Sequence, residues 1–314
     1  MLQTTRFLPL VDTHAHVNLD EFASDLDDLI SRSRAGVFPP IRGRQVDDPV
    51  TRPFVSGLIC PSVDLASSRR ALELAARYDF VFAAVGFHPN HTSAIQEGEW
   101  EQLEELVDQT PRDRLVATGE TGLDRYWDDA PFELQFEFFV KTLELSYEKN
   151  LPVIIHSREA NDDLDSALRD FYADKKKALD SRFAFGVVHS FSGTPEQAER
   201  WLDLGFCLGF GGFVTYPQKK FSDVWEAAKL APRDRILLET DCPFLTPHPL
   251  RGKLERNEPL TTAFVARRLA ELRDVPTSEI VEQTFQNATR LFNLPPLAKE
   301  PLVDSRESAK ESKK

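Results

Sequence analysis

Short runs of apolar and β-branched residues alternate along the chain with longer stretches whose apolar residues recur every three or four positions. Because strand side chains alternate between two faces and helix neighbours lie three or four residues apart, the runs predict strands and the stretches predict helices. The predicted strands cover residues 10–16, 55–63, 81–89, 115–123, 152–157, 185–191, 207–213 and 236–242. The predicted helices include 65–77, 131–149, 195–204 and 262–273.

The number and order of these elements indicate the fold class. Eight strands alternating with helices over about 250 residues predict an α/β protein folded as a single-domain (β/α)8, or TIM, barrel. A doubly wound open sheet is the alternative, and it would normally place a glycine-rich turn after the first strand. The chain continues there as THAHVNLDEF, without a glycine. This favours the barrel.

Two segments interrupt the alternation. Residues 36–54 contain four prolines and mixed charge, which predicts an insertion in the first helix-to-strand connection, on the face away from the chemistry. Residues 297–314 are polar and charged with few large apolar side chains, which predicts a disordered tail. The barrel domain is therefore expected over residues 1–296.

Composition narrows the class of protein. The 314 residues are 41% hydrophobic and 28% charged, and no apolar run approaches the roughly 20 residues of a membrane helix. The N-terminal MLQTTRF is a poor signal peptide. Three cysteines without a C-x-x-C pair, namely Cys60, Cys207 and Cys242, are typical of a reduced protein. We therefore expect a cytoplasmic protein with no membrane partner.

The formal net charge of −13 argues against a broad phosphate-binding surface. It leaves room for a nucleic-acid enzyme whose site binds cations, since two divalent ions add four positive charges locally.

Histidines and acidic residues occur at the ends of the predicted strands. In a parallel barrel, the functional face lies at the carboxyl ends of the strands. The first strand ends in His14 and His16, whose spacing places both imidazoles on one face. Later strands end in His88, Glu120, His156, His189 and Asp241. Random placement would scatter these residues over helices and loops, so the clustering indicates a metal site.

Each residue also has a less specific interpretation. The histidines could be buried residues bonded to carbonyl groups, and Asp241 could cap a helix, although Pro243 weakens that reading. Glu120 lies between glycines that would let backbone approach a ligand, and Asp124 is its nearest rival. Asp241 would end a buried strand, where a cation or a network of donors is needed to offset its burial.

Four histidines and two carboxylates exceed the donors of a single tetrahedral ion. They fit two divalent cations that share one carboxylate and leave positions open for water and substrate. Imidazole-rich ligation suits zinc, manganese or iron better than magnesium. Two such ions activate a water for attack at phosphorus or at a carbonyl carbon, so the expected reaction class is metal-assisted hydrolysis.

The motifs HAH, GFHP, GETGLD, HSRE, HSFSG, ETDCPFL and RNEP, in order from Val11 to Leu294, resemble the TatD family of metal-dependent deoxyribonucleases. That family belongs to the amidohydrolase-like TIM-barrel hydrolases. The resemblance implies that one ion is held by His14, His16, Glu120 and Asp241, and that Glu120 bridges to a second held by His156 and His189. It also implies hydrolysis of DNA, often as a 3′-to-5′ exonuclease on single strands or 3′ ends.

Further roles follow for residues beside the ions. We expect Glu120, Asp241 and His88 to be catalytic. Asp241 would also be the base for the attacking water, and His88 would bind a phosphate oxygen or orient a ligand. Arg158 is a candidate for phosphate binding. Arg256 and Asn257, in LERNEP, match the family's motif, although the loop before them is two residues longer than is usual in the family.

Three functions are compatible with these residues. The first is a two-metal nuclease acting on DNA, with zinc, manganese or magnesium as the metal. The second is a hydrolase of a small amide, lactone or ester that uses the same ions, which the acidic charge favours mildly. A non-catalytic barrel is least favoured, because a scaffold has no need for so many buried ionisable groups.

Overall fold

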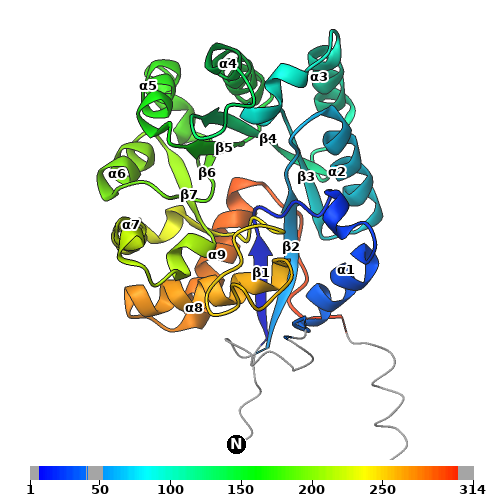
Figure 1. The fold of residues 1–314 in the computed structure, drawn as a ribbon, viewed down its shortest axis with the longest axis vertical. Helices are drawn as coiled ribbons and strands as arrows, with labels where there is room; N and C mark the ends of the chain where they lie inside the picture. Colours follow the sequence, from blue (N-terminus) through cyan, green and yellow to red (C-terminus); the bar gives the residue numbers. More distant parts are fainter. Residues whose placement is uncertain (1–6, 40, 42–51, 303–314) are drawn as a thin grey trace, which may run out of the picture.

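The computed structural model describes residues 7–39, 41 and 52–302, and within them eight parallel strands form one sheet in sequence order. The strands are β1 (Leu8–Asp12), β2 (Pro53–Cys60), β3 (Val81–Val85), β4 (Leu115–Asp124), β5 (Val153–Arg158), β6 (Gly186–Val188), β7 (Phe206–Phe210) and β8 (Ile236–Leu238). The helices are α1 (Leu26–Ala35), α2 (Leu65–Arg77), α3 (Glu99–Gln109), α4 (Phe132–Glu148), α5 (Asn161–Tyr172), α6 (Pro195–Asp203), α7 (Ser222–Leu230), α8 (Thr262–Arg273) and α9 (Thr277–Leu291). Figure 1 shows the helices arranged around the strands, which confirms the predicted (β/α)8 barrel.

The barrel interior is a packed apolar layer to which every strand contributes. Its strand residues are Val11, Ile59, Phe82, Ala84, Val116, Ala117, Ile154, Val187, Cys207 and Leu237. Leu291 of α9 and the adjoining Phe292 belong to the same cluster. Asn287 of α9 donates to the carbonyl of Ile236, the first residue of β8, so α9 covers the amino-terminal end of the barrel. This leaves the carboxyl ends of the strands as the accessible face.

The first strand is shorter than predicted, because its hydrogen bonds divide between two neighbours beyond Asp12. The Ala15 amide donates to the Ile59 carbonyl of β2, whereas the His16 amide donates to the Cys242 carbonyl in the segment after β8. The backbone stays extended without forming a continuous ladder. The second of these bonds joins the segment after β1 to the segment after β8 and so helps to close the barrel.

Helix bounds agree more closely with the sequence pattern, and α2 and α8 begin and end where predicted. Asp64 caps α2 by accepting from the Ser67 amide, in a reciprocal capping box that fixes the first turn. Short-range signals of this kind are visible in the sequence, so helix ends were easier to place than strand ends.

The predicted 36–54 insertion lies largely outside the described residues. Its described end enters β2 at Pro53, which pairs with Leu8 at the amino-terminal side of the barrel. Most of the predicted tail also lies outside them, but residues 297–302 are described: Leu297 packs on the interior cluster and Ser56 donates to the Ala298 carbonyl. The packed chain therefore extends beyond residue 296. None of the described helices has the length and apolar character of a membrane span.

Candidate metal centre

Three strands are each followed by an ionisable side chain that lies two residues beyond a residue of the apolar interior. Ile154, Val187 and Leu237 belong to the interior cluster. Strand residues two apart face the same side, so His156, His189 and Glu239 follow these three toward the barrel axis. Glu239 was missed from the sequence, although its spacing from Leu237 could have revealed it.

Closure of the barrel brings two further metal-binding segments together. The Asp241 amide donates to the His14 carbonyl at 2.8 Å, and the His16 amide donates to the Cys242 carbonyl at 2.9 Å. Asp12, fully buried, accepts from the amides of His14 (3.2 Å) and Thr240 (3.0 Å). One carboxylate thus anchors both segments, which places His14, His16 and Asp241 side by side.

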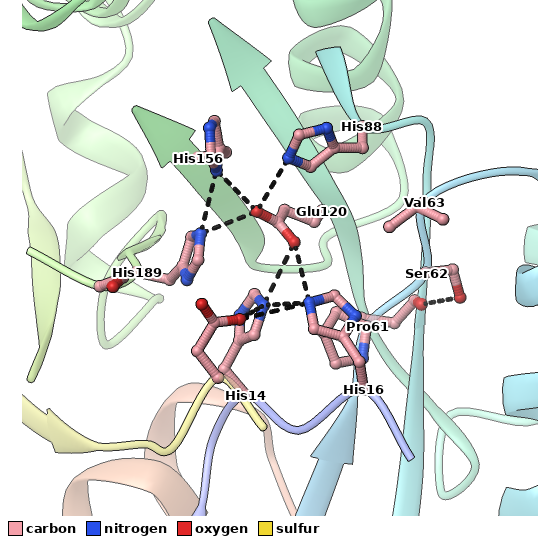
Figure 2. Close-up of polar contacts among 12 residues, drawn as sticks. His14, His16, Pro61, Ser62, Val63, His88, Glu120, His156 and His189 are labelled. Carbon is pink, nitrogen blue, oxygen red and sulfur yellow. Dashed lines mark hydrogen bonds and ion pairs between the residues drawn. The ribbon is translucent and has the colours of Figure 1, made fainter. Parts of the chain in front are cut away.

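Glu120 lies at the centre of the cluster, with each carboxylate oxygen facing a different group of imidazoles (Figure 2). Its Oε2 lies 3.2 Å from His14 Nε2 and 3.3 Å from His16 Nε2. Its Oε1 lies 2.7 Å from His189 Nε2 and 2.9 Å from His156 Nδ1. Glu120 therefore lies between two groups of imidazoles.

The glycines beside Glu120 have a structural role that differs from the expected one. A Cβ on Gly122 would lie 2.0 Å from the His156 carbonyl oxygen, and one on Gly119 would lie 2.6 Å from the Ile154 carbonyl oxygen. Both glycines therefore allow β4 to approach β5 closely. They set Glu120 against His156 and do not open space for a ligand.

Asp241 and His88 lie at the edges of the cluster. Asp241 Oδ1 is 3.4 Å from His16 Nε2, and its side chain keeps 15% of its area exposed. Its φ of 56° is in the left-handed region, which aspartate tolerates better than most residues. His88 Nε2 is 3.5 Å from Glu120 Oε1, and His88 Nδ1 accepts the Asn90 amide. Both side chains therefore reach the space around Glu120.

The buried position of Glu120 shapes its ionisation. Burial would raise the pKa of its carboxyl group, but the surrounding imidazoles, His189 foremost, hold that pKa well below its usual value. Burial and neighbouring positive charge lower the pKa of His14 to about 4 and that of His88 to about 3. The centre thus combines an ionised carboxylate with neutral imidazoles.

For two other histidines, neighbouring carboxylates favour the charged form and raise the pKa. Burial opposes charge on His16, but contacts with Asp241 and Glu120 raise its pKa to about 10. Burial likewise opposes charge on His156, but hydrogen bonds with Asp124 and Glu120 raise its pKa to about 9. Asp124 Oδ2 is 3.2 Å from His156 Nε2, so Asp124 orients this ring from behind instead of replacing Glu120.

The donor set fits divalent cations. Three groups place their donor atoms within 4.8 Å of one another: His14, His16 and Glu120; His88, Glu120 and His156; and His14, His189 and Glu239. The first contains three of the four residues expected at one ion and lacks Asp241. The others add His88 and Glu239, which the sequence had not suggested as donors. Buried imidazoles and carboxylates that converge in this way are the usual ligands of zinc and manganese.

Arg256 and Asn257 are not brought into this cluster. Asn257 is fully buried and donates to the carbonyls of Thr240 and Phe244, so it supports the loop after β8. Arg256 pairs with Asp25 at 2.5 Å. Protein groups thus bind the polar atoms of both residues, and substrate contact by Arg256 and Asn257 stays a prediction. Arg158, at the end of β5, remains beside the site.

Comparison with known proteins agrees with this architecture. Residues 11–293 match the family model described as TatD related DNase. The chain belongs to the TatD family. It is 38% identical over 285 residues to the uncharacterized metal-dependent hydrolase YabD of Bacillus subtilis, covering 91% of this chain and 99% of that one. The family places the chain among metal-dependent hydrolases.

Two further relatives bear on structure and activity. The crystal structure of YjjV, a TatD homologue from Escherichia coli, aligns with a TM-score of 0.77 at 32% identity, covering 91% of this chain and 98% of that one. A protein named 3′-5′ ssDNA/RNA exonuclease TatD, from Erwinia tasmaniensis, is 32% identical and matches 91% of this TatD-family chain and all of its own. The named activity belongs to that relative.

Proposed function

We propose that this TatD-family protein is a metal-dependent nuclease that hydrolyses phosphodiester bonds of DNA, acting from 3′ ends of single strands. The observation that carries the proposal is the position of Glu120, whose two oxygens face separate groups of histidines. A carboxylate placed in this way is suited to bridge two cations. The name of the Erwinia tasmaniensis relative supports nucleic acid as the substrate.

In this proposal His14, His16 and Asp241 would hold one cation and His156 and His189 the other, and Glu120 would contribute to both. The distances of 2.7–3.3 Å between Glu120 and four of these imidazoles support the assignment. The imidazole-rich set favours zinc or manganese over magnesium.

When bound, the cations supply charge that lowers the pKa of water and offsets the negative phosphate. The chain's own residues handle the protons. Asp241, whose side chain is partly exposed at the edge of the cluster, accepts the proton of the attacking water at its carboxylate. His88 keeps its proton on Nε2, because its Nδ1 accepts the Asn90 amide, so His88 Nε2 donates to a phosphate oxygen.

The test uses purified protein stripped of metal and reloaded separately with zinc, manganese or magnesium. A 3′-labelled single-stranded oligonucleotide is the substrate, with His156→Ala as the inactivating variant. His91→Ala is the matched control, because His91 is 44% exposed and outside the cluster. We expect metal-dependent shortening that His156→Ala abolishes and His91→Ala retains. Cleavage without metal, or full activity of His156→Ala, would refute the proposal.

A hydrolase of small amides, lactones or esters is the outcome that would replace it. Such substrates suit a chain of net charge −13 and could be attacked by the same donor set. Turnover of an ester or lactone with no DNA cleavage would decide for this second function.

A further inference from the structure

Three exposed aromatic side chains follow barrel strands at the face that carries the metal centre. Tyr126 is 49% exposed, Trp127 is 55% exposed and Phe244 is 51% exposed. The fourth strongly exposed aromatic residue among those described, Phe136, lies on α4. Single exposed apolar residues are ordinary, but three beside one site indicate a binding surface.

Tyr126 and Trp127 are tied to the cluster by one carboxylate. Asp124 Oδ1 accepts the amides of Tyr126 at 2.8 Å and Trp127 at 3.0 Å. The other oxygen of Asp124 lies 3.2 Å from His156 Nε2. The two aromatic residues are therefore fixed beside His156 while their rings remain open to solvent.

Phe244 lies beside the other half of the cluster. Its amide donates to the Asp241 carbonyl at 2.8 Å, and its carbonyl accepts from Asn257 at 2.8 Å. Its ring centre is 6.4 Å from that of His16. The backbone is thus held on both sides, and the exposed ring adjoins His16.

Arg158 adds a cation to the Tyr126 side. Its guanidinium lies 4.5 Å from the centre of the Tyr126 ring. Arg158 follows His156 by two residues on β5, so it shares the face of that strand. No carboxylate of the residues described pairs with it. A guanidinium placed on a ring without a carboxylate partner is free to bind a phosphate.

We propose that Tyr126 with Trp127, and Phe244 on the opposite side, form two stacking sites for unpaired nucleobases flanking the scissile phosphate. Arg158 binds the backbone phosphate next to the first site. The inference rests on the proposed nuclease function and deepens it. Bases inside a duplex present only their edges, whereas unpaired bases expose faces that stack on aromatic rings. The geometry therefore selects single strands with little regard to sequence.

The test compares two phosphorothioate oligonucleotides of equal length that resist cleavage, one with mixed bases and one abasic throughout. Both carry the same charge, so the ratio of their dissociation constants, measured by fluorescence anisotropy on the metal-loaded protein, reports the contribution of the bases, and the aromatic variants assign it to stacking. We expect the protein to prefer the base-containing strand by roughly 5- to 100-fold. Trp127→Ala and Phe244→Ala each reduce this ratio, whereas Trp127→Phe retains most of it.

Phe136→Ala is the matched control, because it removes an exposed aromatic ring outside the site. Its ratio should equal that of the unaltered protein. Equal binding of both strands by the unaltered protein would overturn the proposal, as would an unchanged ratio in Trp127→Ala and Phe244→Ala. A base preference without cleavage of natural DNA would support the stacking sites and refute the nuclease function. Cleavage of natural DNA without a base preference would support the nuclease function and refute the stacking sites.

Discussion

Replacing Asp12 by alanine should weaken both the fold and the metal centre. The Asp12 side chain is fully buried and accepts three hydrogen bonds: from the His14 amide, the Thr240 amide and the Thr240 hydroxyl, the last at 2.6 Å. The Thr240 hydroxyl also faces the His14 carbonyl at 3.5 Å and can turn toward it. The two amides have no such alternative, so Asp12→Ala leaves both buried without an acceptor.

The magnitude follows from those two amides. Each unsatisfied buried donor costs about 1–3 kcal/mol, and removal of the cost of burying the carboxylate offsets part of this. We expect the free energy of unfolding to fall by about 3 kcal/mol, which corresponds to a melting temperature lower by roughly 4–5 °C for a chain of this size. Asp12→Asn retains one acceptor oxygen and should lose less than half as much.

The assay is urea unfolding followed by circular dichroism, together with elemental analysis of metal bound per chain. Asp203→Ala, at an exposed carboxylate at the end of α6, serves as the control. Metal content should also fall in Asp12→Ala, because Asp12 anchors the segments that carry His14 and Asp241. A loss of less than 1 kcal/mol with unchanged metal content would refute the reasoning.

Three further predictions concern the surroundings of the centre. Glu239→Gln should weaken metal binding about ten-fold or more, measured by titration with a chelating dye, because Glu239 Oε1 lies 3.8 Å from His189 Nδ1 behind that ring. Arg158→Gln should weaken binding of base-containing and abasic DNA equally and lower the slope of affinity against salt concentration by about one. Arg256→Ala should lower unfolding free energy by about 1 kcal/mol at pH 7, a small effect because Asp25 is one-third exposed. Since the Arg256 hydrogen bond lowers the pKa of Asp25, this stabilisation exists above the unfolded pKa and should be lost, in urea unfolding, as pH falls through the lowered pKa of the folded state.

The sequence by itself determined the barrel and the six residues expected to hold metal. Strand and helix periods are local properties, and parallel strands of one barrel end at one face, so His156 and His189 could be placed together without coordinates. Asp241 and the pair His14 and His16 followed in the same way. Capped helices such as α2 were also predictable, since Asp64 and Ser67 interact across three residues.

Tertiary structure decided how these residues meet and what supports them. The direction of each Glu120 oxygen, the anchoring of two segments by Asp12 and the position of Glu239 behind His189 depend on contacts between strands far apart in the chain. Asn257 matched a motif, yet its amide nitrogen donates to two backbone carbonyls and its amide oxygen accepts from the Glu258 amide and the Thr261 hydroxyl. The spacing of residues along the sequence predicts the face on which a side chain lies. The hydrogen-bond partner of that side chain depends on which backbone segment the fold brings close to it.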